Sequence, residues 1–265
     1  MISELINRLL SPCRAALARA LIRLGLRPNH ITVLGMLLTV GAGVAVAAGP
    51  AYWRTWAVGF IVAAGAADLL DGAMAKVGSL RTPFGAALDS VCDRIGDAAL
   101  YLGMVFYYLA EPAGWGGGER GGNLTLAAVA GLGLVWAYMV SYIRARAEAE
   151  MAGIAAGGGF WQRPERLVTL ILALGFHHLP TAVWILGTLP VTTVAHRLWR
   201  ARRELLGRPV AADEPRGLLG VVLWRHRRGT IAFDIYAGAI IMMCVFWNVP
   251  AADPLRRALA RLVGA

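Results

Sequence analysis

Long runs of hydrophobic residues, separated by short polar segments, dominate the pattern along this chain. A helix that crosses a membrane needs roughly 20 mostly apolar residues, and several runs reach or approach that length with their flanks. They cover residues 31–49, 53–75, 84–110, 124–142, 167–179 and 181–195, and residues 229–249 form a candidate seventh run. The pattern therefore predicts an all-α integral membrane protein, built as a six-transmembrane-helix bundle. The topology of the seventh run stays open.

Residues 1–27 differ from the runs that follow, because leucines alternate there with arginines at helical spacing. This pattern predicts an N-terminal amphipathic helix on the membrane surface, and the arginines spread through it argue against a signal peptide. We therefore expect a juxtamembrane helix over residues 1–27, a transmembrane domain over residues 28–203 and a basic tail over residues 204–265. The composition agrees, with 58% hydrophobic and only 16% charged residues.

Basic residues predict the orientation of the bundle. The chain contains 26 lysines and arginines, and they gather before the first run and after the second, fourth and sixth runs. Because basic loops stay on the cytoplasmic side, we predict a multi-pass protein of the cell membrane with both ends of the six-span bundle in the cytoplasm. The same distribution explains the net charge of +10 without a nucleic-acid partner.

Five aspartates lie within 30 positions of the part expected to be embedded in the membrane: Asp68, Asp71, Asp89, Asp93 and Asp97. A carboxylate in hydrocarbon costs about 2.5–3.5 kcal/mol on insertion scales, so such groups normally face a cavity, an ion or a partner. The spacing within each of the pairs Asp68/Asp71 and Asp89/Asp93 places both members on one face of a helix. For Asp97 we expect a packing or hydrogen-bonding role.

A segment of helix-breaking residues, 77–83, separates the two pairs and predicts a turn. Asp71 stands six residues before this segment and Asp89 six residues after it. Two neighbouring antiparallel helices would therefore hold them at equal depth, about 9 Å from the turn. Converging carboxylates need cations, and an all-oxygen site suits magnesium, manganese or calcium better than zinc. We expect two metal ions near the cytoplasmic surface.

These residues form a string with fixed spacing, Asp68-x2-Asp71-Gly72-x2-Ala75-Lys76-x8-Gly85-x3-Asp89-x3-Asp93. The string resembles the signature of the class I CDP-alcohol phosphotransferase family. The resemblance implies a six-helix membrane enzyme, usually a homodimer, that transfers the phosphatidyl group of a CDP-linked lipid to an alcohol with release of CMP. It also implies the role of each residue. Metal, Mg²⁺ or Mn²⁺, is bound by Asp68, Asp71, Asp89 and Asp93; the nucleotide is bound by Asp68, Gly72, Ala75, Lys76 and Gly85; and Asp93 is the catalytic base.

Lys76 departs from the family signature, which has arginine at this position. It is the only lysine in the chain. Lysine keeps the positive charge but lacks the fork that binds two oxygens at once. We therefore expect a weaker hold on the diphosphate, with the chemistry preserved.

A second basic group lies mainly in the loop after the fourth run and comprises Arg144, Arg163, Arg166 and Arg197. In one bundle these arginines would surround the same cavity as the aspartates, and an arginine cluster suits an acceptor that carries phosphate. Residues 141–148 and 163–167 resemble the phosphatidylinositol phosphate synthase branch of the family. That resemblance implies CDP-diacylglycerol as donor and inositol phosphate as acceptor. It is weaker than the aspartate signature, because basic loops also follow from membrane topology.

Other functions remain open at this point. The acceptor could instead be glycerol 3-phosphate, serine or another alcohol. Intramembrane prenyltransferases also use aspartate-rich helices, but their two motifs lie much farther apart than the 25 residues between Asp68 and Asp93. Ion transporters carry intramembrane carboxylates as well, but near the midplane rather than near a cytoplasmic turn.

Overall fold

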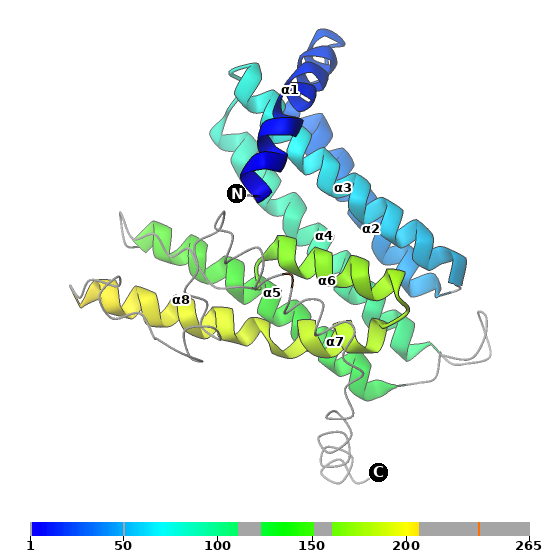
Figure 1. Ribbon diagram of the computed structural model, residues 1–265. Coiled ribbons are helices and arrows are strands. Elements are labelled where there is room, and N and C mark those ends of the chain that lie inside the picture. Colours follow the sequence, from blue (N-terminus) through cyan, green and yellow to red (C-terminus); the bar gives the residue numbers. More distant parts are fainter. Residues whose placement is uncertain (1, 50, 111–122, 151–160, 207–237, 239–265) are drawn as a thin grey trace.

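The computed structural model describes residues 2–49, 51–110, 123–150, 161–206 and 238. Within these residues it contains helices and no strands (Figure 1), so the predicted all-α class is confirmed for them. The helices are α1 (Ile2–Arg23), α2 (Pro28–Ala48), α3 (Ala51–Val77), α4 (Pro83–Leu109), α5 (Leu124–Glu150), α6 (Arg163–Gly175), α7 (Leu179–Thr188) and α8 (Pro190–Leu205). Apart from residue 238, the candidate seventh run lies outside the described residues, as does nearly all of the basic tail.

Among the residues that the structure describes, four segments are long and apolar enough to cross a membrane: Pro28–Ala48, Trp53–Val77, Leu124–Ala149 and Leu179–Arg203. α4 has the same length as α3, 27 residues, but the charged residues along it keep it out of this set. α6 has 13 residues and is therefore about 20 Å long, shorter than a hydrocarbon core of about 30 Å. The described residues thus support a membrane protein with four candidate spans, and the count of six stays a prediction.

The turn between the two acidic helices forms where the sequence predicts it. α3 ends at Val77 and α4 begins at Pro83. Between them, Ser79 adopts a left-handed backbone conformation with φ 53°. The Thr82 side chain then caps α4 by accepting a hydrogen bond from the backbone N–H of Gly85 at 2.9 Å. Pro83 suits the first helical turn, because the N–H that it lacks has no helical partner there.

α2 packs along both α3 and α4 (Figure 1). Small residues allow the close approach to α4. A Cβ atom on Gly96 would lie 3.0 Å from the Thr39 side chain, and a Cβ atom on Gly43 would overlap the Ala99 carbonyl. α3 and α4 make little contact with each other over the described residues. The expectation that these two helices pack as direct neighbours is therefore wrong, because residue spacing defines the face of a helix but not its packing partner.

The largest core cluster joins α4 to α5 and α7. On α4, Tyr101, Met104, Tyr107 and Tyr108 are each 3% exposed or less. At the other end of the molecule, α1 packs on α3 and buries Ala18 completely. α6 packs against α3 and α7, and its first turn reaches α4 through charged side chains. The packing leaves a polar region between α3, α4 and the start of α6.

Candidate active site

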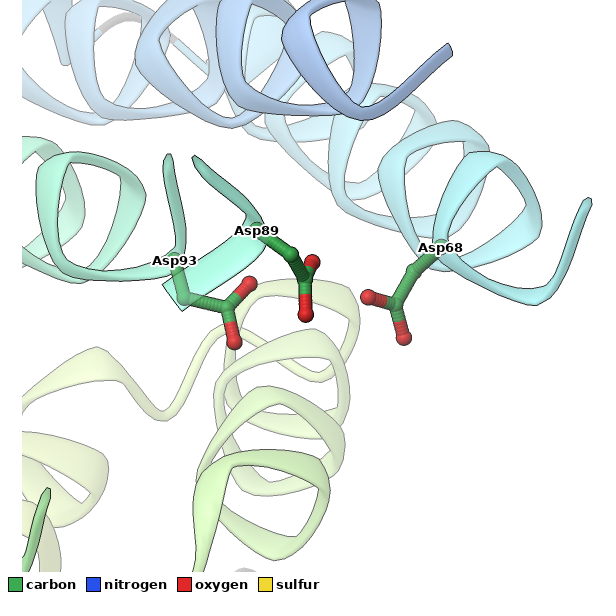
Figure 2. A group of neighbouring side chains, drawn as sticks. All are labelled: Asp68, Asp89 and Asp93. Atoms are coloured by element: carbon green, nitrogen blue, oxygen red, sulfur yellow. The ribbon is translucent and has the colours of Figure 1, made fainter. Parts of the chain in front are cut away.

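Three aspartates from two helices form an acidic cluster, defined here as Asp68 of α3 with Asp89 and Asp93 of α4. One carboxylate oxygen from each lies within 4.8 Å of the others. Figure 2 shows the three carboxyl groups pointing toward one another across the gap between α3 and α4. The convergence inferred from the sequence therefore occurs, although the two helices do not pack directly.

Asp71 lies beside this cluster and lines the same narrow cavity as its three members. It is 9% exposed, and its Oδ2 accepts a hydrogen bond of 2.6 Å from the Thr32 hydroxyl of α2. Cys92 lines the cavity as well. All four predicted metal ligands thus line one cavity, which we call the acidic cavity, and Asp71 is also hydrogen-bonded to α2.

The donor chemistry of this cavity fits a hard divalent cation. The acidic cluster offers carboxylate oxygens, which Mg²⁺ and Mn²⁺ prefer, rather than the nitrogen and sulfur ligands that zinc favours. Converging carboxylates repel one another unless positive charge is close. Part of that charge comes from Arg163, whose Nη1 lies 2.6 Å from Oδ1 of Asp93 and 3.5 Å from Oδ1 of Asp68.

A cavity of about 320 Å³ opens on the α2 side of the acidic cluster, and we call it the polar cavity because Asn29, Asp71 and Asp89 are among the residues that line it. Its lining includes every glycine and alanine of the predicted nucleotide site: Gly72, Ala75 and Gly85. Gly72 faces open space, since an added Cβ would have no heavy atom within 4 Å. Asp68 belongs to the adjoining acidic cavity instead. Lys76 is exposed and is not among the residues that line the polar cavity.

An arginine cavity of about 150 Å³ lies on the other side of Asp93. All four arginines of the predicted acceptor site line it: Arg144, Arg163, Arg166 and Arg197. Arg166 and Arg197 are 4% and 2% exposed, and Nη1 of Arg197 donates a hydrogen bond to the Val140 carbonyl. Arg144 is exposed and pairs with Glu148 at 2.8 Å on the same helix. The bundle therefore gathers arginines from α5, α6 and α8 at one place.

An apolar groove of about 730 Å³ adjoins the acidic cluster. Hydrophobic side chains of α3 and α6 provide most of its walls, including Ile61, Leu69, Leu167 and Ile171. The acidic cluster and Arg163 line one part of the same groove. A molecule with a charged head and apolar chains could therefore contact both kinds of surface at once.

Several residues that line the polar and arginine cavities were not predicted from the sequence. Asn29, Thr32 and Thr82 line the polar cavity, and Arg94 lines the arginine cavity, with its Nη1 3.7 Å from Oδ2 of Asp93. Arg94 could have been predicted, because it is a charged residue next to Asp93 within an apolar run. Thr32 could not have been predicted, since only the packing of α2 on α3 brings it to Asp71, 39 positions away in the sequence.

The fold and this site define a helical membrane protein in which an acidic cluster, with donor atoms that suit a divalent metal, lies between a polar cavity, an arginine cavity and an apolar groove. The chain belongs to the CDP-alcohol phosphatidyltransferase family, whose sequence model matches residues 26–203. It is therefore a transferase of substituted phosphate groups that acts in phospholipid synthesis.

Curated relatives share about a third of their residues with this chain. The phosphatidylinositol phosphate synthase of Mycolicibacterium smegmatis is 36% identical over 195 residues, which cover 70% of this chain and 82% of that protein. The protein of the same name from Streptomyces avermitilis is 33% identical over 211 residues, covering 75% of this chain and 80% of that protein. The match thus spans most of the length of each relative.

Solved structures show the same fold. The phosphatidylinositol phosphate synthase of Mycobacterium tuberculosis in complex with manganese and citrate superposes with a TM-score of 0.62 at 29% identity, covering 77% of this chain and 93% of that one. The structure of the same enzyme with CDP-DAG bound also gives a TM-score of 0.62, covering 98% of that chain.

Proposed function

We propose that the protein transfers the phosphatidyl group of CDP-diacylglycerol to inositol phosphate, giving phosphatidylinositol phosphate and CMP. The main structural support for this proposal is that Asp93 and Arg163 line both the acidic cavity and the arginine cavity. An acceptor whose phosphate is held by the arginines therefore places its hydroxyl groups near the carboxylate of Asp93. The curated relatives are named for synthesis of phosphatidylinositol phosphate, which supports the same acceptor here.

The donor occupies the other two spaces. Its cytidine and diphosphate lie in the polar cavity beside Gly72 and Gly85, and its acyl chains follow the apolar groove. The two spaces share Asp89, so one molecule can extend from the first to the second. The related enzyme solved with CDP-DAG bound supports this donor. Lys76, exposed one turn after Gly72, is the proposed point charge for the diphosphate, although it lies outside the lining of the polar cavity.

Two ions of Mg²⁺ or Mn²⁺ belong to the proposed site, held by Asp68, Asp71, Asp89 and Asp93. When bound, they neutralise charge on the diphosphate and on the leaving CMP. The related enzyme crystallised with manganese supports a divalent cation. The hydrogen bond from Thr32 holds Asp71 toward this cavity, so α2 contributes to the shape of the metal site.

The chemistry is a substitution at the phosphorus nearer the lipid. A bond forms from the acceptor oxygen to this phosphorus, and the bond to the CMP oxygen breaks with its electron pair leaving on CMP. Asp93 accepts the proton of the attacking hydroxyl as general base. Arg163, 2.6 Å from one oxygen of Asp93, limits the orientations of that carboxyl group and links it to the arginine cavity.

The proposed arrangement in the membrane has six spans, with α4 and α6 added to the four apolar segments, and the active site faces the cytoplasm. α1 lies along the membrane surface, and two copies of the chain form a homodimer. The basic loops support this orientation. The family match over residues 26–203 supports a catalytic domain close to residues 28–203.

An acceptor panel tests the proposed function. The full chain, purified in detergent, is incubated with CDP-diacylglycerol and Mg²⁺, and CMP and the lipid product are measured with inositol phosphate, free inositol, glycerol 3-phosphate or serine. We expect the highest kcat/KM for inositol phosphate. Free inositol and serine lack a phosphate for the arginines, and the names of the curated relatives favour inositol phosphate over glycerol 3-phosphate. A higher value for free inositol or serine would overturn the assignment of the arginine cavity. A higher value for glycerol 3-phosphate would overturn the acceptor alone.

A further inference from the structure

Asp97 lies outside the signature, yet it joins the two arginines at the start of α6. It is 5% exposed. Its Oδ2 accepts a hydrogen bond of 2.5 Å from Nη2 of Arg166, and its Oδ1 lies 3.8 Å from Nε of Arg163. Each carboxylate oxygen of Asp97 thus faces a different arginine, in agreement with the hydrogen-bonding role expected from the sequence.

Each arginine also contacts a second group besides Asp97. Arg163 turns its Nη1 to Asp93 at 2.6 Å, and Nη1 of Arg166 donates to the Trp161 carbonyl at 3.3 Å. Both guanidinium groups line the arginine cavity together with Asp97. The two side chains are therefore held at defined points while they remain available to the cavity.

We propose that Asp97 is a positioning residue for the acceptor: it fixes Arg163 and Arg166 in the orientation that receives the acceptor phosphate. The inference rests on the proposed function of the arginine cavity. Arginine recognises phosphate through a planar fork whose orientation determines how many bonds it makes. A fork held before the ligand arrives loses less conformational entropy on binding.

The negative charge of Asp97 also opposes the binding of an anion, so two effects of opposite sign compete. If orientation dominates, loss of the carboxylate weakens acceptor binding. If charge dominates, the same loss makes the cavity more positive and strengthens acceptor binding. Steady-state kinetics with the acceptor varied therefore distinguish the two effects by sign.

The test compares Asp97→Asn, Asp97→Ala and Asp97→Glu in the full chain. We expect the acceptor KM to rise by up to about 100-fold in Asp97→Ala, since misplacement of about 1 Å at a reacting site can cost about 100-fold. A smaller rise is expected in Asp97→Asn, which keeps one oxygen for Arg166, and partial recovery relative to alanine in Asp97→Glu. The donor KM should rise less than the acceptor KM, because Asp97 itself lines neither the polar cavity nor the apolar groove, and of its two arginine partners only Arg163 lines that groove.

Leu174→Ala is the matched control for a general loss of stability. Leu174 lies on α6, as do both arginines, and is 2% exposed, but it lines none of the cavities that form the site. Its substitution should reduce the yield of folded protein without selective change in the acceptor KM. If Asp97→Ala cannot be extracted in folded form, the acceptor KM of the isosteric Asp97→Asn variant decides whether Asp97 has the positioning role.

An acceptor KM that is unchanged, lowered, or shifted no more than in Leu174→Ala overturns the positioning role. Failure of the proposed function is distinguishable from failure of the positioning role. It appears in the unmodified protein as a higher kcat/KM for another acceptor of the panel. If that acceptor carries phosphate, the same Asp97 series is measured with it. If it carries none, the positioning role fails together with the arginine cavity.

Discussion

Replacing Gly85 with alanine should disturb both the start of α4 and the binding of the donor. A Cβ atom on Gly85 would lie 3.0 Å from Oγ1 of Thr82 and 3.2 Å from Oδ1 of Asn29. The Thr82 oxygen caps α4, and all three residues line the polar cavity. Because both contacts are tighter than ordinary van der Waals distance, the added methyl group has to displace the cap, the Asn29 amide or both.

The two effects should differ in size. Loss of an N-cap costs about 0.5–2 kcal/mol, whereas glycine to alanine within a helix gains up to about 1 kcal/mol. The free energy of unfolding should therefore change by about 1 kcal/mol or less. Donor binding should suffer more, since misplacement of about 1 Å beside a reacting ligand can cost about 100-fold. We expect the KM for CDP-diacylglycerol to rise about 10- to 100-fold.

Donor kinetics in mixed micelles, combined with thermal unfolding, separate these effects. Gly72→Ala should raise the donor KM without loss of stability, because Gly72 lines the polar cavity but meets no atom within 4 Å. Gly59→Ala on α3 is the matched control, since it also meets no atom and lines none of the site cavities. A donor KM in Gly85→Ala within twofold of the Gly59→Ala value would refute the placement of the nucleotide.

Three further substitutions or treatments test the site. Asp93→Asn should lower kcat by about 10²- to 10⁴-fold, the usual contribution of a general base, with a thermal midpoint near that of the unmodified protein; near-normal turnover would remove the assignment. Chelation of divalent metal should abolish CMP release, and Mg²⁺ or Mn²⁺ should restore it; release that survives chelation argues against a metal site. Arg144→Ala should raise the acceptor KM yet cost no more than about 0.5 kcal/mol of stability, because its pair with Glu148 is exposed. An acceptor KM equal to that of the unmodified protein would exclude Arg144 from acceptor binding.

The convergence of the acidic side chains could be predicted from the sequence because helical spacing is a local property. Asp89 and Asp93 share a face of α4 by their four-residue separation alone, and the breaker segment correctly placed the turn before them. The arginines were predicted by a coarser rule, namely that basic loops gather on one side. All four line one cavity, but their partners could not be anticipated. The pairing of Arg166 with Asp97, for example, depends on how α6 crosses α4.

The helix boundaries, in contrast, were predicted poorly from the sequence. The sixth apolar run was expected over residues 181–195, whereas the structure has α7 from Leu179, a break at Pro190, and α8 continuing to Leu205. Proline starts a new helix at this point because it has no N–H for the preceding turn. Hydropathy alone did not detect the continuation, since α8 becomes rich in arginine toward its end.

The position of α2 explains how so many charges leave room for a substrate. Helices in direct contact lie about 8–10 Å apart, and at that distance the carboxylates of α3 and α4 would fill the space between them. Instead α2 packs on both helices from one side, with a Cβ on Gly35 only 3.3 Å from Ala67 of α3 and Gly96 of α4 close to Thr39. α3 and α4 are thus held by α2 rather than by each other. Their acidic faces can meet across a gap that a diphosphate and metal could share, so Gly35 of α2 and Gly96 of α4 help to set the space available to the proposed active site.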